Sequence, residues 1–162
     1  MNKLFANLSS CTEISGLQNI DTSVVSDMSS LFFNCKKLQK LTFEEAFNTE
    51  NVIDMSYMFS GCEYLSILDL CMFDTHKVTN MNFMFYGCIN LATIYIKDDN
   101  KFVTTSVTSG DSMFYCCYAI QGGAGTKYDV SHIDSTYARI DKGSESGTPG
   151  YFTKDILSET AY

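Results

Sequence analysis

Apolar residues recur along this chain in a pattern of two parts. The first part places them at positions i, i+3 and i+4, as in DMSYMFSGC at Asp54–Cys62, which is typical of one face of a short helix. The second part is a leucine ladder of spacing L-x-x-L-x-L, as in EYLSILDL at Glu63–Leu70. The end of the ladder alternates apolar and polar residues, as a strand with one buried face does. Each unit is therefore predicted to contain a strand, a turn and a short helix.

The unit is repeated along most of the chain. DMSSLFFNC at Asp27–Cys35 and NMNFMFYGC at Asn80–Cys88 are further copies, and their first methionines lie 27 and 26 residues from Met55. Weaker copies begin at Leu4 and end at Gly110–Cys117. Self-similarity at this period, together with the ladder spacing of leucine-rich repeats, predicts a solenoid in which each repeat stacks on the next.

The repeats divide the chain into two parts. Residues 1–117 are expected to hold about four to five copies of 26–29 residues. Residues 118–162 lack the ladder and are predicted to form a loop-and-strand cap on the last repeat, with Lys154–Tyr162 either a short helix or a frayed end. The first repeat begins without a polar cap, so we expect an open end with apolar side chains and unpaired strand amides.

The repeated polar residues have predicted structural roles. Asp54 stands at the start of a predicted helix, where its oxygen accepts an amide of the first turn, as do Asp27 and Asn80. Gly61 and Gly87 stand where a short helix ends in a left-handed residue. Free Cys behaves as a small buried hydrophobe, so the thiols that recur at one repeat position are expected to be core residues. These thiols are Cys35, Cys62, Cys88 and Cys117.

The bulk composition argues against several classes of function. A chain of 162 residues fits one domain, and its net charge of -8 opposes binding to nucleic acid, which depends on Lys and Arg. The same charge argues against an anionic membrane surface, and no apolar run is long enough for membrane insertion. The N-terminal residues have no continuous apolar core, so they are not read as a signal peptide.

We assign no residue to catalysis, to a metal or to a cofactor. His76 and His132 are the only histidines, and no local signature pairs either with a nucleophilic thiol. The turn at Lys97–Lys101 offers oxygen donors, but not at the spacing of an EF-hand, so a solvated turn is preferred to a calcium site. The protein is expected not to be an enzyme, and a thiol-dependent enzyme is the least favoured hypothesis.

The outward side of the predicted strands is the candidate binding face. Side chains between the ladder leucines point away from the core and differ from repeat to repeat. Ile67 and Tyr95 form an apolar patch among charges, a composition that suits contact with a protein or a glycan. The residues of this strand face are Lys40, Thr42, Glu44, Ile67, Asp69, Thr93, Tyr95 and Lys97.

The repeat string [FI]-[DN]-T-x-x-V-x-x-M-x-x-M-F-x-G-C-x-x-L-x-x-L-x-L resembles that of the BspA-like leucine-rich repeat surface proteins. The resemblance covers about Leu4–Cys117, and the ending with YARID at Tyr137–Asp141 and PGYFT at Pro149–Thr153 is similar to the ending of that family. It implies a right-handed α/β solenoid with parallel strands on one face, short helices on the other and a C-terminal cap. It also implies a bacterial cell-surface or secreted protein, and some members of that family are adhesins. Because no signal peptide is recognised, the chain is a piece of a longer protein, is exported unusually or stays inside the cell.

Two functional hypotheses follow from this reasoning. The first is a non-enzymatic binding or adhesion module that contacts a host or bacterial surface protein or a glycan through the strand face. The second is a structural spacer or self-assembling segment without a specific ligand, which associates end to end through its N-terminal repeat.

Overall fold

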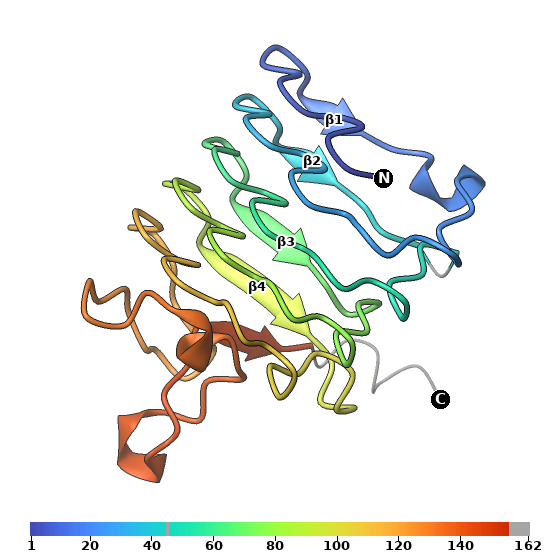
Figure 1. Cartoon of the computed structure of the whole chain (residues 1–162). Coiled ribbons are helices and arrows are strands. Elements are labelled where there is room, and N and C mark those ends of the chain that lie inside the picture. The colour runs from blue at the N-terminus through green and yellow to red at the C-terminus, as the bar shows by residue number, and fades with distance from the viewer. Residues whose placement is uncertain (45, 156–162) are drawn as a thin grey trace, which may run out of the picture.

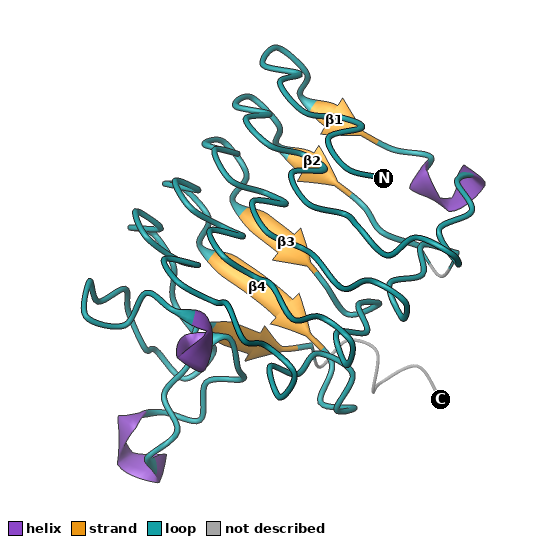
Figure 2. Cartoon of the chain, viewed as in Figure 1, coloured by secondary structure: helices purple, strands orange, loops and turns teal. Residues whose placement is uncertain are grey.

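The computed structural model describes residues 1–44 and 46–155, which form a row of stacked repeats with a cap at one end (Figure 1). Within this part of the chain the only helices are short 3-10 turns, labelled η (Figure 2). The predicted segment Lys154–Tyr162 lies outside the described residues from position 156 onward. The elements in chain order are β1 (Glu13–Ile14), η1 (Leu17–Asn19), β2 (Lys40–Leu41), β3 (Ile67–Asp69), β4 (Thr93–Ile96), η2 (Ser135–Tyr137), η3 (Ser144–Ser146) and β5 (Phe152–Lys154).

The short strands form two separate parallel sheets on one side of the row. β1 pairs with β2, and β3, β4 and β5 form a three-stranded sheet in that order. Equivalent residues of successive repeats lie opposite each other, since Ile67 pairs with Thr93 and Asp69 pairs with Tyr95. β5 belongs to the cap, so the cap contributes the last strand of the second sheet.

The repeated DMSxMFxGC phrase forms a pair of turns instead of a helix. Within one repeat the Met58 amide donates to the Met55 carbonyl at 3.2 Å, and the Cys62 amide donates to the Phe59 carbonyl at 3.1 Å. The Phe59 amide, between them, donates to the Met84 carbonyl of the next repeat at 2.9 Å. Alternate amides therefore close turns and join neighbouring repeats.

Residues in the left-handed conformation produce this alternation. Tyr57 has a φ of 56° and Gly61 a φ of 76°, and the equivalent positions of the other copies are also left-handed. Glycine adopts this conformation without steric penalty, whereas a residue with a side chain does so at a cost of about 1–2 kcal/mol. The left-handed conformation predicted for Gly61 and Gly87 is confirmed, but these residues close turns and do not end helices.

The predicted fold class is wrong. The described residues contain no α-helix, and their strands of two to four residues form two small parallel sheets, so the chain is not a leucine-rich-repeat solenoid with helices on its second face. The helical interpretation failed because the paired turns bury the same positions that a helix would bury. Met55, Met58 and Phe59, at i, i+3 and i+4, are all 0% exposed.

The residues predicted to cap helices close turns as well. The amide and the hydroxyl of Ser56 both donate to Asp54 Oδ1, at 2.8 and 2.6 Å. Asp54 also pairs through its backbone with Asp27 and Asn80, in a parallel bridge to the repeat on each side. The short polar side chain satisfies a local amide, as was predicted, but without a helix behind it.

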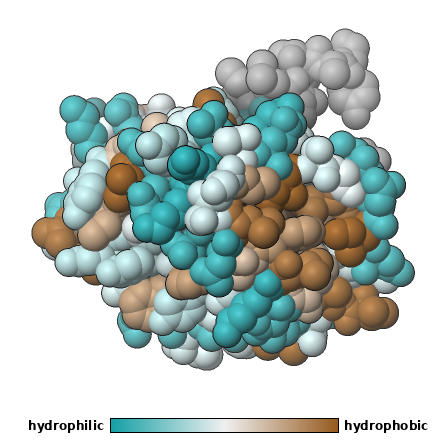
Figure 3. Space-filling model, turned by 90° about the horizontal axis from the view of Figure 1, so that it is seen from above, coloured by the Kyte–Doolittle hydropathy of each residue, from teal (hydrophilic) through white to brown (hydrophobic). Residues whose placement is uncertain are grey.

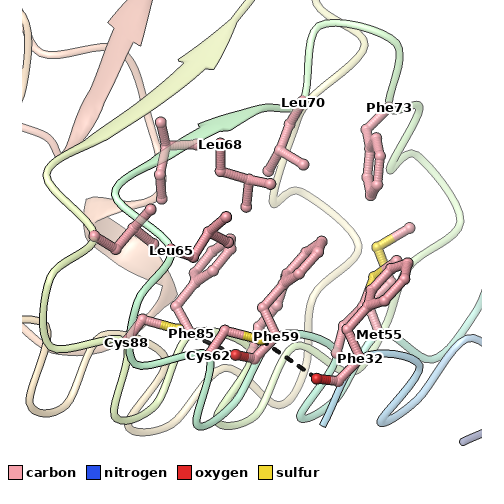
Figure 4. Packing of buried hydrophobic residues seen from close by; sticks show 14 of the residues in the cluster. Phe32, Met55, Phe59, Cys62, Leu65, Leu68, Leu70, Phe73, Phe85 and Cys88 are labelled. Atoms are coloured by element: carbon pink, nitrogen blue, oxygen red, sulfur yellow. Dashed lines mark hydrogen bonds between the residues drawn. The ribbon is translucent and has the colours of Figure 1, made fainter. Parts of the chain in front are cut away.

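Phenylalanine rings stack in a continuous row through the core (Figure 4). Neighbouring rings have centroids 5.5–5.6 Å apart and interplanar angles of 4–17°. Figure 4 shows three of these rings, Phe32, Phe59 and Phe85, side by side and facing the leucine ladder. The row consists of Phe5, Phe32, Phe59, Phe85 and Phe114.

The recurring thiols join each repeat to the one before it. The Cys62 thiol donates to the Phe32 carbonyl at 3.3 Å, and the Cys88 thiol donates to the Phe59 carbonyl at 3.0 Å (Figure 4). The prediction of buried packing thiols is confirmed, because Cys35, Cys62, Cys88 and Cys117 are all free and buried.

Buried threonines make a second set of links between repeats. Thr49, which is 1% exposed, accepts a hydrogen bond from the Asp74 amide at 2.8 Å and donates to the Asp74 carbonyl at 2.9 Å. Thr22 makes the same reciprocal pair with Asn48. A hydroxyl is suited to this role because it can donate and accept at once.

The cap covers the last repeat and satisfies its free amides. The Phe114 amide donates to the Ile133 carbonyl at 2.8 Å, and the Cys116 amide donates to the Tyr128 hydroxyl at 3.3 Å. Tyr151, at 0% exposure, packs its ring against Phe114 at a centroid distance of 5.1 Å. The row of stacked repeats is therefore closed at this end.

A single buried carboxylate organises the cap. Asp141 accepts hydrogen bonds from the amides of Ala124, Thr126 and Gly143, each at 2.9 Å, and from the Thr126 hydroxyl at 2.7 Å. Burial raises the pKa of Asp141, but the hydrogen bonds from Thr126, Gly143 and Ala124 outweigh burial and hold the pKa below its ordinary value.

Replacing Thr49 with Val is expected to lower the free energy of unfolding by about 1–3 kcal/mol, because the partly buried amide and carbonyl of Asp74 lose their partner. Thr49→Ser keeps the hydroxyl and is the matched control. Urea denaturation followed by circular dichroism measures both variants. Equal stability of Thr49→Val and Thr49→Ser would contradict a linking role for the hydroxyl.

The stability of the protein is expected to fall in acid through Asp141. Because the pKa of Asp141 is lower in the folded state than in the unfolded state, its contribution is present above the unfolded pKa and is lost as pH falls through the folded pKa. Asp141→Asn should be less stable at neutral pH and should lose less stability than the unmodified protein between about pH 4 and pH 2. Thermal unfolding across this range is the measurement, with the exposed Asp111→Asn as control, and an unchanged acid slope in Asp141→Asn would contradict the assignment.

Candidate binding groove

The structure places only some residues of the predicted strand face next to one another. Ile67, Asp69, Thr93 and Tyr95 lie on the paired strands β3 and β4, where Ile67 is opposite Thr93 and Asp69 is opposite Tyr95. Ile67 is 56% exposed. This portion of the face is therefore contiguous, and its role in binding stays a prediction.

The remaining residues of the predicted face lie outside the paired strands β3 and β4. Lys40 belongs to β2, in the other sheet, and forms an ion pair with Glu13 at 2.8 Å. Thr42 and Glu44 follow β2 and are exposed. Lys97 follows β4 and lines a depression of about 210 Å³ that it shares with Arg139 of the cap. The predicted face thus extends over two sheets that lie on the same side of the row.

A groove runs across the repeats on the side of the turns that precede the strands. These turns line up along the left edge of the row in Figure 1. The groove has a volume of about 530 Å³, within the range that is usual for ligand sites. We call it the turn-side groove, and its lining residues are Phe33, Asn34, Ser60, Gly61, Glu63, Tyr86, Gly87, Ile89, Cys116 and Tyr118.

The left-handed residues form one column of this lining. Asn34, Gly61, Gly87 and Cys116 all have positive φ and stand at equivalent positions of four successive repeats. The amides of the first three are already bonded, to the carbonyls of the next repeat at 2.7–2.9 Å. This column therefore offers a ligand little side chain and few free main-chain donors.

Aromatic and apolar side chains flank that column. Phe33, Ser60 and Tyr86 occupy the position just before the left-handed residue, and Tyr86 is 39% exposed. Two positions after the left-handed residue stand Ile89, 38% exposed, and Tyr118, 64% exposed. The chemistry available to a ligand is thus mainly stacking and apolar contact.

Sequence reasoning missed the groove because it assigned these residues to a helix. In a helix, the residue before the glycine would have been one more surface position. A signal was present in the sequence, since that position holds the aromatic residues Phe33, Tyr86 and Tyr115 in three of the copies. The rings of Tyr86 and Tyr115 stack at 5.5 Å.

The residues considered for catalysis have structural partners. His76 Nδ1 lies 2.9 Å from Asp74 Oδ1, and His132 stacks on Tyr137 at 4.3 Å. Burial raises the pKa of the Cys62 and Cys88 thiols, which favours the protonated form that donates to the neighbouring carbonyl.

Among residues 1–44 and 46–155 no three His, Cys, Asp or Glu side chains are grouped so as to hold a metal ion. In the same part of the chain no helix has the length and hydrophobicity to cross a membrane.

The structure defines a protein of stacked repeats with a grooved side. The chain belongs to a family of Mycoplasma proteins of unknown function, DUF285, whose profile matches residues 1–125. No curated protein and no solved structure shows significant similarity to it. The resemblance to BspA-like leucine-rich repeat proteins is therefore wrong: the repeated Met, Phe, Gly and Cys positions that suggested it belong to this other family. The expected cell-surface location and adhesive role rested on that resemblance.

The buried thiols are expected to resist alkylation in the folded protein. Cys62 and Cys88 should react with iodoacetamide at least about a hundredfold more slowly than the half-buried Cys116, because burial blocks access and disfavours the thiolate. Peptide mass spectrometry after timed labelling measures the rates, and labelling in urea is the control for full reactivity. Reaction of Cys62 as fast as Cys116 would revive the thiol-dependent enzyme hypothesis.

Proposed function

We propose that this protein is a non-enzymatic binding module that holds an extended ligand, a protein segment or a glycan chain, in the turn-side groove. The observation that carries the proposal is the groove itself, which crosses four repeats and is flanked by Phe33, Tyr86 and Tyr118. Exposed aromatic side chains beside a concave surface supply large contact area at a small cost in conformational entropy.

The groove supports binding better than the predicted strand face does. Ligand sites are usually concave and mostly apolar, with a few polar groups that fix orientation. The groove has these properties, and its polar groups include the Glu63 carboxylate, which pairs with Lys36 at 3.0 Å, and the Asn34 amide. The strand face has the exposed Ile67 and the half-buried Tyr95 as its apolar residues and divides between two sheets.

The alternative function, a self-assembling spacer, depends on the open N-terminal end. Leu4 and Leu8 there are 55% and 42% exposed, and Figure 3, which looks from the side of β1, shows hydrophobic residues gathered on this side of the molecule. The carbonyls of Asn2, Leu4 and Ala6 have no donor among the described residues. In the next repeat, the equivalent carbonyls of Ser29, Leu31 and Phe33 accept amides of the first repeat.

Two of the matching donors that a second copy would offer this end are already occupied. The equivalent amides at the other end of the row, those of Phe114 and Cys116, are bonded to the cap. If two N-terminal ends met face to face, the free carbonyls of one copy would lie against the free carbonyls of the other, and no hydrogen bond could form between them. Self-stacking would therefore require the cap to move, which counts against the self-assembling form of this alternative and leaves the spacer form as it was.

The proposal is tested by selecting ligands and then removing one surface at a time. The immobilised protein is probed with a phage-displayed random peptide library and with a glycan array. We expect probes that bind the protein to be lost with the double variant Phe33→Ser, Tyr86→Ser and retained with Ile67→Ser, Tyr95→Ser, which alters the strand face. Thermal melting checks that both variants stay folded.

Two outcomes overturn the proposal. Loss of the probes only with the strand-face variant would assign binding to that face. Enrichment of no peptide and no glycan above a denatured-protein control would favour the spacer. In that case, light scattering over a range of concentrations measures whether the protein associates with itself.

A further inference from the structure

A second depression lies between the loop that follows β4 and the cap, and it shares no lining residue with the turn-side groove. Its volume is about 210 Å³. One wall comes from the loop at positions 97–102 and the other from the cap segment at positions 139–142. The walls are brought together because β4 pairs with β5, and Phe152 of β5 pairs in turn with Ile140 (Figure 1). We call this site the cap depression.

The loop wall of the cap depression is an insertion in the repeat, and the floor beneath it is apolar. Two residues separate Leu70 from Phe73, whereas five separate the equivalent Ile96 and Phe102. Ile96 and Phe102 line the depression although they are only 3% and 8% exposed, so they form its bottom. The Phe102 ring is held there by an edge contact with the Phe152 ring, at a centroid distance of 5.1 Å.

The rim of the cap depression is cationic. Lys97, Arg139 and Lys142 line it, and Arg139 and Lys142 are exposed. Within residues 1–44 and 46–155 none of the three forms an ion pair. The Asp98 carboxylate also lines the depression, but it lies 3.6 Å from the ammonium group of Lys154. The lining therefore offers positive charge to a ligand, in a chain whose net charge is -8.

Arg139 is held in a position that suits a planar anion. Its Nε donates to the Pro149 carbonyl at 2.9 Å, and its guanidinium lies over the Tyr137 ring, 5.7 Å from the centroid. The two terminal nitrogens have no acceptor in the described part of the chain. A guanidinium fork matches the two oxygens of a carboxylate, and a fork that is already fixed loses less side-chain entropy on binding.

We propose that the cap depression binds a small monocarboxylic acid, with the carboxylate on Arg139 and an apolar body on Phe102. The volume is below the range of about 300–1,000 Å³ that is usual for larger ligands, so the acid is small. A phosphate or a polyanion would make no use of the apolar floor, and the net charge of -8 would repel it more strongly. A neutral apolar molecule would displace water from the terminal nitrogens of Arg139 without giving them an acceptor.

An NMR titration of the isotope-labelled protein with sodium benzoate tests the proposal, with benzamide as the neutral molecule of similar shape. We expect saturable shifts of the backbone amide signals at positions 97–102 and 139–142. Benzamide should bind at least about tenfold more weakly, because it lacks the charged partner of the guanidinium. Absence of saturable shifts with benzoate, or equal binding of benzamide, would overturn the proposal.

Substitutions on the rim test the roles of charge and geometry. Arg139→Gln should weaken benzoate binding about tenfold or more, and Arg139→Lys should also weaken it because the charge remains but the fork is lost. Lys142→Gln is a second variant that leaves the bond to Pro149 intact, and it should weaken binding severalfold. Lys37→Gln removes an exposed charge outside the depression and should leave binding unchanged. Thermal melting checks that each variant is folded, and unchanged binding in folded Arg139→Gln or, if that variant does not fold, in Lys142→Gln would overturn the assignment.

Further probes distinguish the source of the anion. Inorganic phosphate that binds as tightly as benzoate would overturn the role of the apolar floor. A short peptide with a free C-terminal phenylalanine carries the same carboxylate, and tenfold tighter binding of this peptide would overturn the small acid in favour of the C-terminus of a partner protein. The double variant Phe33→Ser, Tyr86→Ser alters only the turn-side groove and should leave benzoate binding unchanged. This inference and the proposed function therefore succeed or fail separately.

Discussion

The structure depends on one constraint, that each repeat must complete its backbone hydrogen bonds with its neighbours. Alternate amides of the paired turns point along the row, and the Phe59 amide, for example, reaches the Met84 carbonyl at 2.9 Å. A repeat alone would leave these groups unpaired, and buried unpaired backbone groups are costly. The repeats are therefore stable only as a set. The cap is needed to supply hydrogen-bond acceptors for the amides of the last repeat, which has no following repeat to bond.

Stacking in register has a consequence for the side chains. Each repeated residue lies next to its own copies, so the residue types that recur at one position are those that stack on their copies or bond the backbone around them. Phenylalanine does this by ring stacking, with centroids 5.5–5.6 Å apart, and aspartate or asparagine does so by bonding its own turn. Threonine and cysteine instead bond the backbone of an adjacent repeat. The repeated residues thus build the scaffold, and the differences between copies, such as Ser60 against Tyr86, shape the surface.

The same left-handed residues that join the repeats also help to form the candidate site. Gly61 and Gly87 turn the chain so that their amides bond the next repeat, and the absence of a side chain there keeps the groove open between its aromatic and apolar flanks. Architecture and groove therefore have a common origin. A change at these glycines would affect both the backbone ladder and the depth of the groove, which is why the variants that probe binding are better placed on the flanking residues.

The sequence by itself determined the repeat period, the buried stripe of Met55, Met58 and Phe59, the buried thiols and the left-handed glycines, because each depends only on a residue type recurring at a fixed position. It did not determine that the stripe is a pair of turns and not a helix. The i, i+3, i+4 pattern fits both, and the choice depends on whether alternate amides find partners within the repeat or in the next one. Only the tertiary structure decides this, and with it the groove, since the neighbouring repeat supplies the acceptors that make the turns more favourable than a helix.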